Sequence, residues 1–298
     1  MVNKFESVII ESPRDVVYPF DKEVFEDIEI FYHGTSNIYS ERIEERGFTT
    51  DDIPYSIEDV LRVCESYDSV RFAGFISGGG YGVLKAFTLG ALASYESQVM
   101  PVSFALGYWS ARRYARNAGG ETIAHIIRAG YEFEELVGDP SKRQAHREHL
   151  SNKLAHPALA PGPYSNLRDE YLTCLERLSD EAHLRNKLEE VLQIRDKYLE
   201  ITKDAYPVVY AVKLTPEWVE SEGHYSWKRL PPVLQYEDGP MEVRIRTGTT
   251  VPASSIVRRA DFVNGAERWV SNGNVGVPLP WLLESDQRDA AWDQGLFI

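Results

Sequence analysis

The sequence predicts an α+β fold in which a block of helices interrupts one β-sheet. Strand-like apolar runs occur at residues 28–32 and 101–106, and again at 207–214 and 241–246. Between these groups, residues 140–203 are rich in charge and poor in glycine, and their apolar side chains recur at helical spacing. Strands on both sides of a helical block favour a single domain over two sequential ones, with a helical insertion at about 140–203.

The first part of the chain predicts one strand and two helices. Residues 1–27 are acidic and are expected to form a loosely structured lead-in to the strand at 28–32. The run Asn37–Arg46 predicts a short helix that stops at Gly47-Phe48. Residues 51–68 predict another, because four of them share 3.6-residue spacing. These four are Ile57, Val60, Leu61 and Cys64.

The middle of the chain predicts a loop, a buried helix and a strand–helix pair. The glycine cluster at 77–82 lacks the Lys-Ser/Thr of a phosphate-binding loop, so a flexible loop is favoured over a phosphate cradle. Residues 83–95 are apolar and predict a buried helix. The strand at 101–106 ends at Gly107, and a helix is expected over 108–117. Residues 122–129 predict a strand or a short helix.

The second half predicts the helical block and then more strands. The apolar positions at helical spacing are Leu172, Leu175, Leu178, Leu184, Leu188, Val191, Leu192 and Tyr198. The proline-rich piece at 156–163 is expected to be a turn between two or three helices. Strands are expected at 207–214, 241–246 and 255–261, followed by an irregular tail at 265–298.

Composition limits the classes of function. The formal net charge of −14 argues against a broad basic surface for nucleic acid, although 32 Lys and Arg leave room for a local patch. The polar N-terminus predicts no secretory signal, and no apolar run approaches the ~20 residues that span a bilayer. We therefore expect a cytoplasmic protein with no membrane partner. Cys64 and Cys174 have no metal-ligand spacing and are expected to be reduced core thiols.

Tyr32-His33-Gly34-Thr35-Ser36 is the most informative motif. It joins the strand at 28–32 to the helix that ends at Gly47-Phe48. A strand end presents a side chain at the edge of a cleft, and glycine lets a ligand approach the backbone. This arrangement resembles the first motif of the ADP-ribosyltransferase superfamily, which implies that the core is that family's split β-sheet. The resemblance also implies that His33 binds the NAD ribose, that the Gly34 backbone binds the nicotinamide amide, and that Thr35 lies in the same NAD-binding motif.

A second motif follows the middle strand. The family places a helix there with the pattern Ala-x-x-Tyr-Ala, which is similar to Ala111 to Ala115. In the diphtheria-toxin-like branch, two aromatic residues eleven positions apart sandwich the nicotinamide ring. Tyr114 matches the second, but the first position falls on Ser103, beside Phe104. The resemblance therefore implies that Tyr114 stacks on NAD. Its counterpart is either Ser103 in a polar role or Phe104 in a shifted register.

A third motif begins at Pro240-Met241-Glu242 and continues through a Val-Pro turn into an Ile-containing strand. It resembles the catalytic Glu motif of the superfamily. Cleavage of the nicotinamide–ribose bond creates an oxocarbenium-like ribose, and a carboxylate can hold its 2′-hydroxyl and offset the charge. Members that modify arginine usually carry a second Glu where this chain has Pro240. Arginine is therefore the less favoured acceptor.

The order His33, Tyr114, Glu242 is that of the branch that includes diphtheria toxin, poly-ADP-ribose polymerases and RNA 2′-phosphotransferases. The resemblance implies an NAD-dependent mono-ADP-ribosyltransferase, a glycosyltransferase that uses NAD as substrate and needs no metal. Its acceptor would be a protein, RNA or DNA. By family analogy it would be a toxin of a toxin–antitoxin or phage-defence system, with an antitoxin protein as a partner. We expect His33, Tyr114 and Glu242 to line one pocket.

Other functions remain open, and two basic segments have more than one interpretation. The chain could instead be an NAD glycohydrolase or an RNA 2′-phosphotransferase-like enzyme, or an inactive binding module whose 140–203 helices bind a partner. For His146 and His149, a solvated helix face is favoured over a metal site. Arg112, Arg113 and Arg116 are expected to form a basic patch for the NAD diphosphate or a nucleic-acid acceptor.

Overall fold

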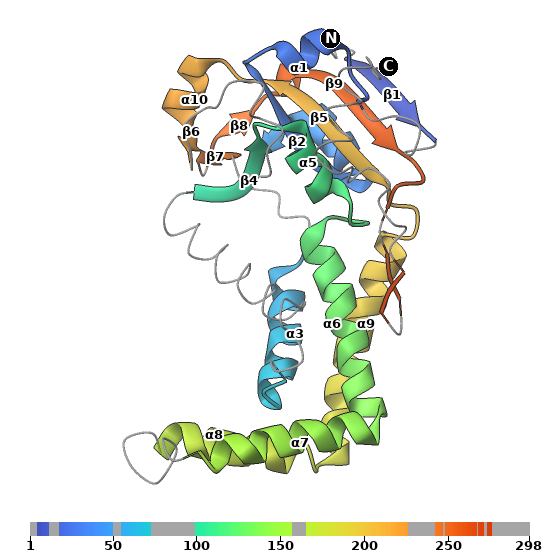
Figure 1. Ribbon diagram of the computed structural model, residues 1–298, viewed down its shortest axis with the longest axis vertical. Helices are drawn as coiled ribbons and strands as arrows, with labels where there is room; N and C mark the ends of the chain where they lie inside the picture. The colour runs from blue at the N-terminus through green and yellow to red at the C-terminus, as the bar shows by residue number, and fades with distance from the viewer. Residues whose placement is uncertain are drawn as a thin grey trace, which may run out of the picture.

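Seven strands form one mixed sheet, shown in the upper part of the molecule in Figure 1. The computed structural model describes residues 5–11, 18–49, 55–72, 99–156, 165–225, 242–246, 248–266, 268–270 and 273–275. In spatial order the strands are β1 (Glu6–Ile10), β9 (Ile256–Phe262), β5 (Pro207–Lys213), β2 (Ile30–Ser36), β4 (Val99–Ala105), β7 (Glu242–Arg246) and β6 (Gly223–Tyr225). β1 is parallel to β9, and the other neighbours are antiparallel. The predicted α+β class is confirmed.

Each face of the sheet covers a core of its own, because alternate strand residues point to opposite sides. One face, here called the α5 face, buries Tyr32, Ala105 and Val209 beneath helix α5 (Tyr108–Ala115). The other, the α2 face, buries Phe31, Phe104 and Tyr210 with helix α2 (Ser40–Arg46). The further elements of this region are α1 (Lys22–Glu26), η1 (Asn37–Tyr39), β3 (Phe48–Thr49), α10 (Pro216–Glu222), β8 (Thr250–Val251) and η4 (Ala253–Ser255).

The sheet is most weakly joined between β2 and β4. The pairing of β2 with β5 runs through seven residue pairs, from Ile30 with Lys213 to Ser36 with Pro207. In contrast, β2 and β4 share the single pair Tyr32–Ala105. This junction, which we call the β2–β4 seam, divides the sheet into a four-stranded and a three-stranded half. His33 lies one residue beyond the shared pair.

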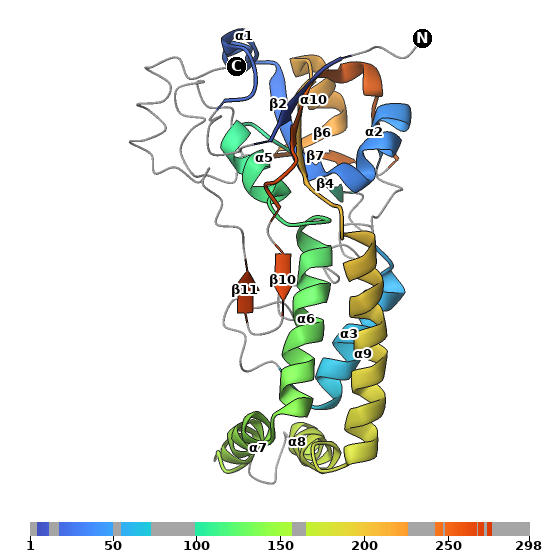
Figure 2. The same cartoon turned by 90° about the vertical axis from the view of Figure 1, so that its right-hand side faces the viewer.

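Helices of the described residues form a stalk that extends away from the sheet (Figures 1 and 2). They are α3 (Ile57–Ser69), α6 (Glu121–Gly138), α7 (Pro140–Leu154), α8 (Ser165–Arg177) and α9 (Glu181–Ile201). Helices α6 and α9 run side by side along the stalk with α3, and α7 and α8 cross its far end (Figures 1 and 2). Their core contains Val63, Ile126 and Val191 and shares no buried residue with the two cores of the sheet.

Local sequence explains where the stalk helices begin. The Ser56 hydroxyl caps α3 by accepting a hydrogen bond from the Asp59 amide. Asp139 caps α7, with Pro140 in the first turn, and Asp180 caps α9. Such side chains satisfy amides that lack a partner within the helix, and proline at the first position removes one of them.

A small junction ties the stalk to the sheet. The Tyr39 hydroxyl donates to the Gly119 carbonyl over 2.8 Å, and Gly119 lies between α5 and α6. The Asn37 amide oxygen accepts from the Tyr206 amide over 2.7 Å, between α9 and β5. Both residues belong to η1, directly after β2. The strand that carries His33 therefore ends at the junction with the stalk.

Several predicted elements differ from the structure. The lead-in contains β1 and α1, so the expectation of a loosely structured segment is wrong for the part of 1–27 that is described. Residues 122–129 belong to α6, a helix that precedes the expected insertion at about 140–203. The helices of the insertion pack on α3, on α6 and on one another, away from the two cores of the sheet. Within the tail, β10 (Arg268–Val270) pairs with β11 (Gly273–Val275).

Other predictions concern segments outside the described residues. These are the glycine cluster at 77–82, the helix at 83–95, most of the turn at 156–163 and the tail after 275. The strands at 207–214, 241–246 and 255–261 agree with β5, β7 and β9. None of the helices in the described ranges combines the length and apolar character of a membrane-spanning helix.

Candidate functional site at the seam

His33 joins the two halves of the sheet through its side chain. Its Nδ1 lies 2.9 Å from the carbonyl oxygen of Ser103 on β4. A carbonyl can only accept, so Nδ1 must carry the proton and donate. In the neutral ring, Nε2 is then an acceptor. No other hydrogen bond to this ring occurs among the described residues.

The surroundings of His33 favour the neutral ring. Burial lowers the pKa of His33 below its usual 6.5, and the bond to the Ser103 carbonyl offsets this only in part. Burial acts in this direction because the charged imidazolium loses more hydration than the neutral ring. The residue still retains some exposure to solvent. At neutral pH, His33 therefore offers an uncharged acceptor, suited to a hydroxyl group.

Two phenylalanine rings enclose the imidazole on the α2 face. The Phe48 ring lies 4.9 Å from the His33 ring, edge to face at 64°. The Phe104 ring lies 5.5 Å away, tilted by 52°, and the two Phe rings contact each other at 5.1 Å. Phe104 is fully buried, so its ring packs on His33 and does not face solvent.

A partly buried ionic group lies along the same row of the sheet. His33 pairs with Tyr210 on β5, and Tyr210 pairs with Arg259 on β9. The guanidinium of Arg259 binds Asp261 at 2.5 Å and also binds Glu44 of α2, which accepts from the Tyr210 hydroxyl at 3.2 Å. Burial raises the pKa of Asp261, and the bond to Arg259 opposes that rise. This group fixes α2 beside the row that contains His33.

Gly34 has a packing role that the sequence did not predict. A Cβ at this position would lie 1.6 Å from the carbonyl oxygen of Ala111 and 3.1 Å from the Ala115 amide nitrogen. Helix α5 therefore rests directly on the backbone of β2. Packing alone therefore requires glycine at this position, whether or not a ligand binds there. Thr35, the next residue, pairs with Val208 and is partly buried.

The α5 residues that were expected to bind NAD differ in their exposure to solvent. Tyr114 is 45% exposed. Arg112, expected in a basic patch, is buried instead, with its guanidinium 4.7 Å from the Phe262 ring and 5.7 Å from that of Tyr108. Burial lowers the pKa of Arg112 to about 10. Arg112 therefore belongs to the α5-face core, while Arg113 is exposed.

Glu242 and Ser103 are placed by strand register. Glu242 begins β7 opposite Ala105, which is itself opposite Tyr32. This row of the sheet lies next to the row of His33. The side chain of Glu242 lies outside what the structure describes, so the shared pocket with His33 and Tyr114 stays a prediction. Ser103 pairs with Arg244 and contributes its carbonyl to the bond with His33.

Residues away from the seam do not form a metal site in the described part of the chain. His146 is fully buried and its Nε2 lies 2.9 Å from the Val70 carbonyl, so the expected solvated face is wrong for this residue. His149 is exposed. Cys64 and Cys174 are free and buried, as predicted.

Sequence reasoning missed Phe48, Tyr210 and the ionic group. The Gly47-Phe48 step was interpreted only as a helix end. Two signals were available: a tyrosine in the centre of the apolar run 207–214, and Arg259 and Asp261 two residues apart in a strand, hence on one face. Glu44 gave no signal, because it lies among other charged residues of a short helix.

Comparisons of the chain with protein-family models, with curated proteins and with solved structures gave no match.

Proposed function

We propose that the protein is an NAD-dependent mono-ADP-ribosyltransferase that acts at the β2–β4 seam. The observation that carries the proposal is the geometry of His33. A neutral imidazole at the junction of two half-sheets, with Nδ1 bonded to the Ser103 carbonyl, presents Nε2 as an acceptor for a hydroxyl group. The ribose of NAD offers hydroxyl groups of that kind.

Glu242 supplies the charge in the proposed reaction. The bond from the ribose C1′ to the nicotinamide nitrogen breaks, its electron pair leaves with nicotinamide, and the ribose becomes oxocarbenium-like. A carboxylate beside the 2′-hydroxyl stabilises that state, and a nucleophile of the acceptor then bonds to C1′ and loses its proton. The register places the backbone of Glu242, one strand beyond β4, in the row next to that of His33. Adjacent rows project to opposite faces of a sheet, so the proposed role of Glu242 rests on its sequence motif.

The burial of the aromatic residues bears on the proposed contacts with the nicotinamide ring. Tyr114 is 45% exposed on α5, which agrees with a role in stacking on the nicotinamide ring. Phe104 is buried, so Ser103 is the better counterpart. We further propose a protein, RNA or DNA acceptor, a cytoplasmic toxin function, and an antitoxin as partner. The stalk, which extends away from the sheet (Figure 1), is the proposed surface for acceptor or antitoxin.

The test is turnover of NAD labelled separately in the nicotinamide and the adenosine part. Transfer predicts release of nicotinamide together with label on a macromolecule. Free ADP-ribose alone would indicate a glycohydrolase. Nicotinamide release that needs a 2′-phosphorylated RNA, with the adenosine label and the phosphate leaving together on a small molecule, would indicate a 2′-phosphotransferase. The assay also includes lysate proteins and nucleic acids as acceptors. If no nicotinamide is released under these conditions, all functions that consume NAD are contradicted and an inactive binding module is favoured.

A pair of histidine variants locates the activity. His33→Ala should abolish most turnover, because the ribose loses its partner at the seam. His149→Ala is the matched control at saturating acceptor: this residue is exposed on α7, a stalk helix that could contribute to acceptor binding but not to the bond cleavage, so its loss should leave the maximal rate unchanged. Equal turnover of the two variants would remove His33 from the site.

A further inference from the structure

The Gly47-Phe48 step places an aromatic ring against His33. Gly47 ends α2 with a φ of +83°, and a Cβ there would lie 2.1 Å from the Val251 carbonyl oxygen. Only glycine suits such a position. The chain turns sharply at this residue, and Phe48 pairs with Val251 of β8. This turn brings the Phe48 ring back to His33, with the two ring centres 4.9 Å apart.

Phe48 is itself fixed from several sides. It is 3% exposed, and its ring contacts Phe104 at 5.1 Å and Tyr210 at 5.7 Å, both close to edge-on. Such contacts between rings favour defined orientations over free rotation. A ring held in this way leaves the His33 imidazole little freedom to turn about its own side-chain bonds.

The orientation of the imidazole matters chemically. Rotation of the ring by half a turn would exchange the positions of its nitrogen and carbon atoms, and the bond from Nδ1 to the Ser103 carbonyl would be lost. With that bond in place, the Nδ1–H tautomer is fixed and Nε2 remains the acceptor. We propose that Phe48 is a positioning residue that holds His33 in the orientation and tautomer needed at the seam. Its role in catalysis rests on the proposed function, but the positioning itself does not.

The direct test is nitrogen NMR of histidine in the protein labelled with ¹⁵N-histidine, titrated between pH 5 and 8. The signal of His33 is assigned by its absence in His33→Gln. The wild type should show a protonated Nδ1, an unprotonated Nε2 and a pKa below the usual 6.5. In Phe48→Leu, which keeps an apolar side chain but removes the ring, His33 should show a mixture of tautomers and a higher pKa.

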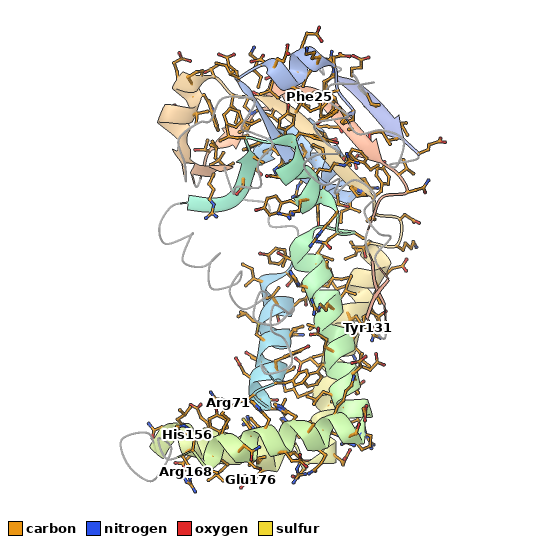
Figure 3. All side chains as sticks on the ribbon, viewed as in Figure 1. Phe25, Arg71, Tyr131, His156, Arg168 and Glu176 are labelled. Carbon is orange, nitrogen blue, oxygen red and sulfur yellow. The ribbon has the colours of Figure 1, made fainter. Side chains whose placement is uncertain are left out.

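Phe25→Leu is the matched control. Phe25 is also buried, but it contacts Tyr32 and Tyr108 in the core of the α5 face. Figure 3 shows it at the top of the molecule. Phe25→Leu also removes a buried ring from the sheet region. Both Phe25→Leu and Phe48→Leu should therefore melt at a lower temperature than the wild type. In Phe25→Leu, however, the His33 tautomer and pKa should equal those of the wild type.

Two outcomes would overturn the positioning role: a folded Phe48→Leu protein with the His33 signals of the wild type, or a wild type whose His33 carries its proton on Nε2. If Phe48→Leu does not fold, Phe48→Met gives the same decision, since its flexible chain fills the volume without a ring.

Turnover of NAD separates this proposal from the previous one. If the wild type consumes NAD, Phe48→Leu should lower kcat by up to about a hundredfold, the effect of displacing a catalytic group by about 1 Å. Phe25→Leu should retain it. If the wild type does not consume NAD, the proposed function fails, and the NMR result still decides whether Phe48 positions His33.

Discussion

The sheet region and the helical stalk are stabilised in different ways. At the sheet, backbones touch: α5 rests on Gly34, and Gly47 lies against the Val251 carbonyl. In the stalk, side chains reach across to the end of α3. The His146 ring donates to the Val70 carbonyl, and Arg177 donates to that of Ser69. Backbone contact tolerates no added atom, whereas a side-chain contact can adjust. Substitutions should therefore be far more damaging at the sheet.

Gly34→Ala should have the largest effect. The added methyl group would overlap the Ala111 carbonyl, and neither β2 nor α5 can move without disturbing the α5-face core. Overlap with the backbone belongs to the class of substitutions that cost more than about 4–5 kcal/mol, so we expect the variant not to fold. The measurement is urea unfolding followed by circular dichroism.

The matched change in the stalk is Gly130→Ala. A Cβ there would meet only side-chain atoms of Arg195, the nearest at 2.6 Å. The nearest atom is the Arg195 Cβ, which is fixed to the backbone of α9, so α9 must shift slightly to admit the methyl group. The preference of alanine over glycine in a helix, roughly 0.5–1 kcal/mol, offsets part of that cost. The variant should fold. Equal losses of stability at the two glycines would contradict the distinction between backbone and side-chain packing.

Glu242→Gln should affect chemistry and leave stability unchanged. The amide keeps the size of the side chain but lacks the charge that the proposed transition state needs. The loss is typically a factor of about a hundred to a thousand in rate, or ~3–4 kcal/mol. Initial rates with labelled NAD, an NAD titration and a thermal melt measure it. If the chain is a toxin, the variant should also relieve growth arrest on expression.

Two results would alter the role of Glu242. A variant that melts normally and keeps a rate within a factor of about three of the wild type has lost no catalytic group. A variant that unfolds would indicate a structural strand residue. Glu217→Gln, exposed on α10 beside the sheet, is the matched control and should change neither rate nor melting.

Local patterns predicted the elements better than their contacts. The strands at β5, β7 and β9 follow from β-branched runs, and the helix over 108–117 from its position after Gly107. Residue spacing does not reveal which residues approach in space. Gly34 was interpreted through a ligand because its neighbour, Ala111, is far away in the sequence. The burial of Arg112 and His146 was missed for the same reason: a charged or polar residue predicts exposure unless its aromatic or carbonyl partners are known.

Acidification should loosen the stalk. Burial lowers the pKa of His146 below its usual 6.5, while its bond to the Val70 carbonyl opposes the change. Above pH 6.5 both folded and unfolded states hold the neutral ring. As the pH falls below that value, the unfolded state binds a proton more readily, so stability declines by about 1.4 kcal/mol for each pKa unit of lowering.

The measurement compares unfolding free energies at pH 7.5 and 5.5. The wild type should lose more stability on acidification than His146→Gln, whose amide can still donate to Val70 but does not titrate. His149→Gln should keep most of the wild-type loss, because the charge of His149, whose ring stacks on that of His146 at 6.4 Å, is the smallest of the causes that shift the pKa of His146. His33 and His183 also have pKa values lowered by burial, so some acid sensitivity should persist in His146→Gln. Identical losses in wild type and His146→Gln would exclude His146 as a source.

The smallest expected effect is the coupling between the two regions. Ile245 is buried in the α2-face core and Ile126 in the stalk core, and these cores share no buried residue. Each Ile→Val substitution should cost about 0.5–1.5 kcal/mol. Because distant sites without shared partners act independently, the double variant should lose the sum of the two to within about 0.5 kcal/mol. Urea unfolding of the four proteins measures this, with Ile126→Val plus Ile194→Val, both in the stalk core, as the control pair. A coupling above about 1 kcal/mol between sheet and stalk would mean that the junction at Asn37 and Tyr39 transmits packing changes, and that binding to the stalk can act on His33.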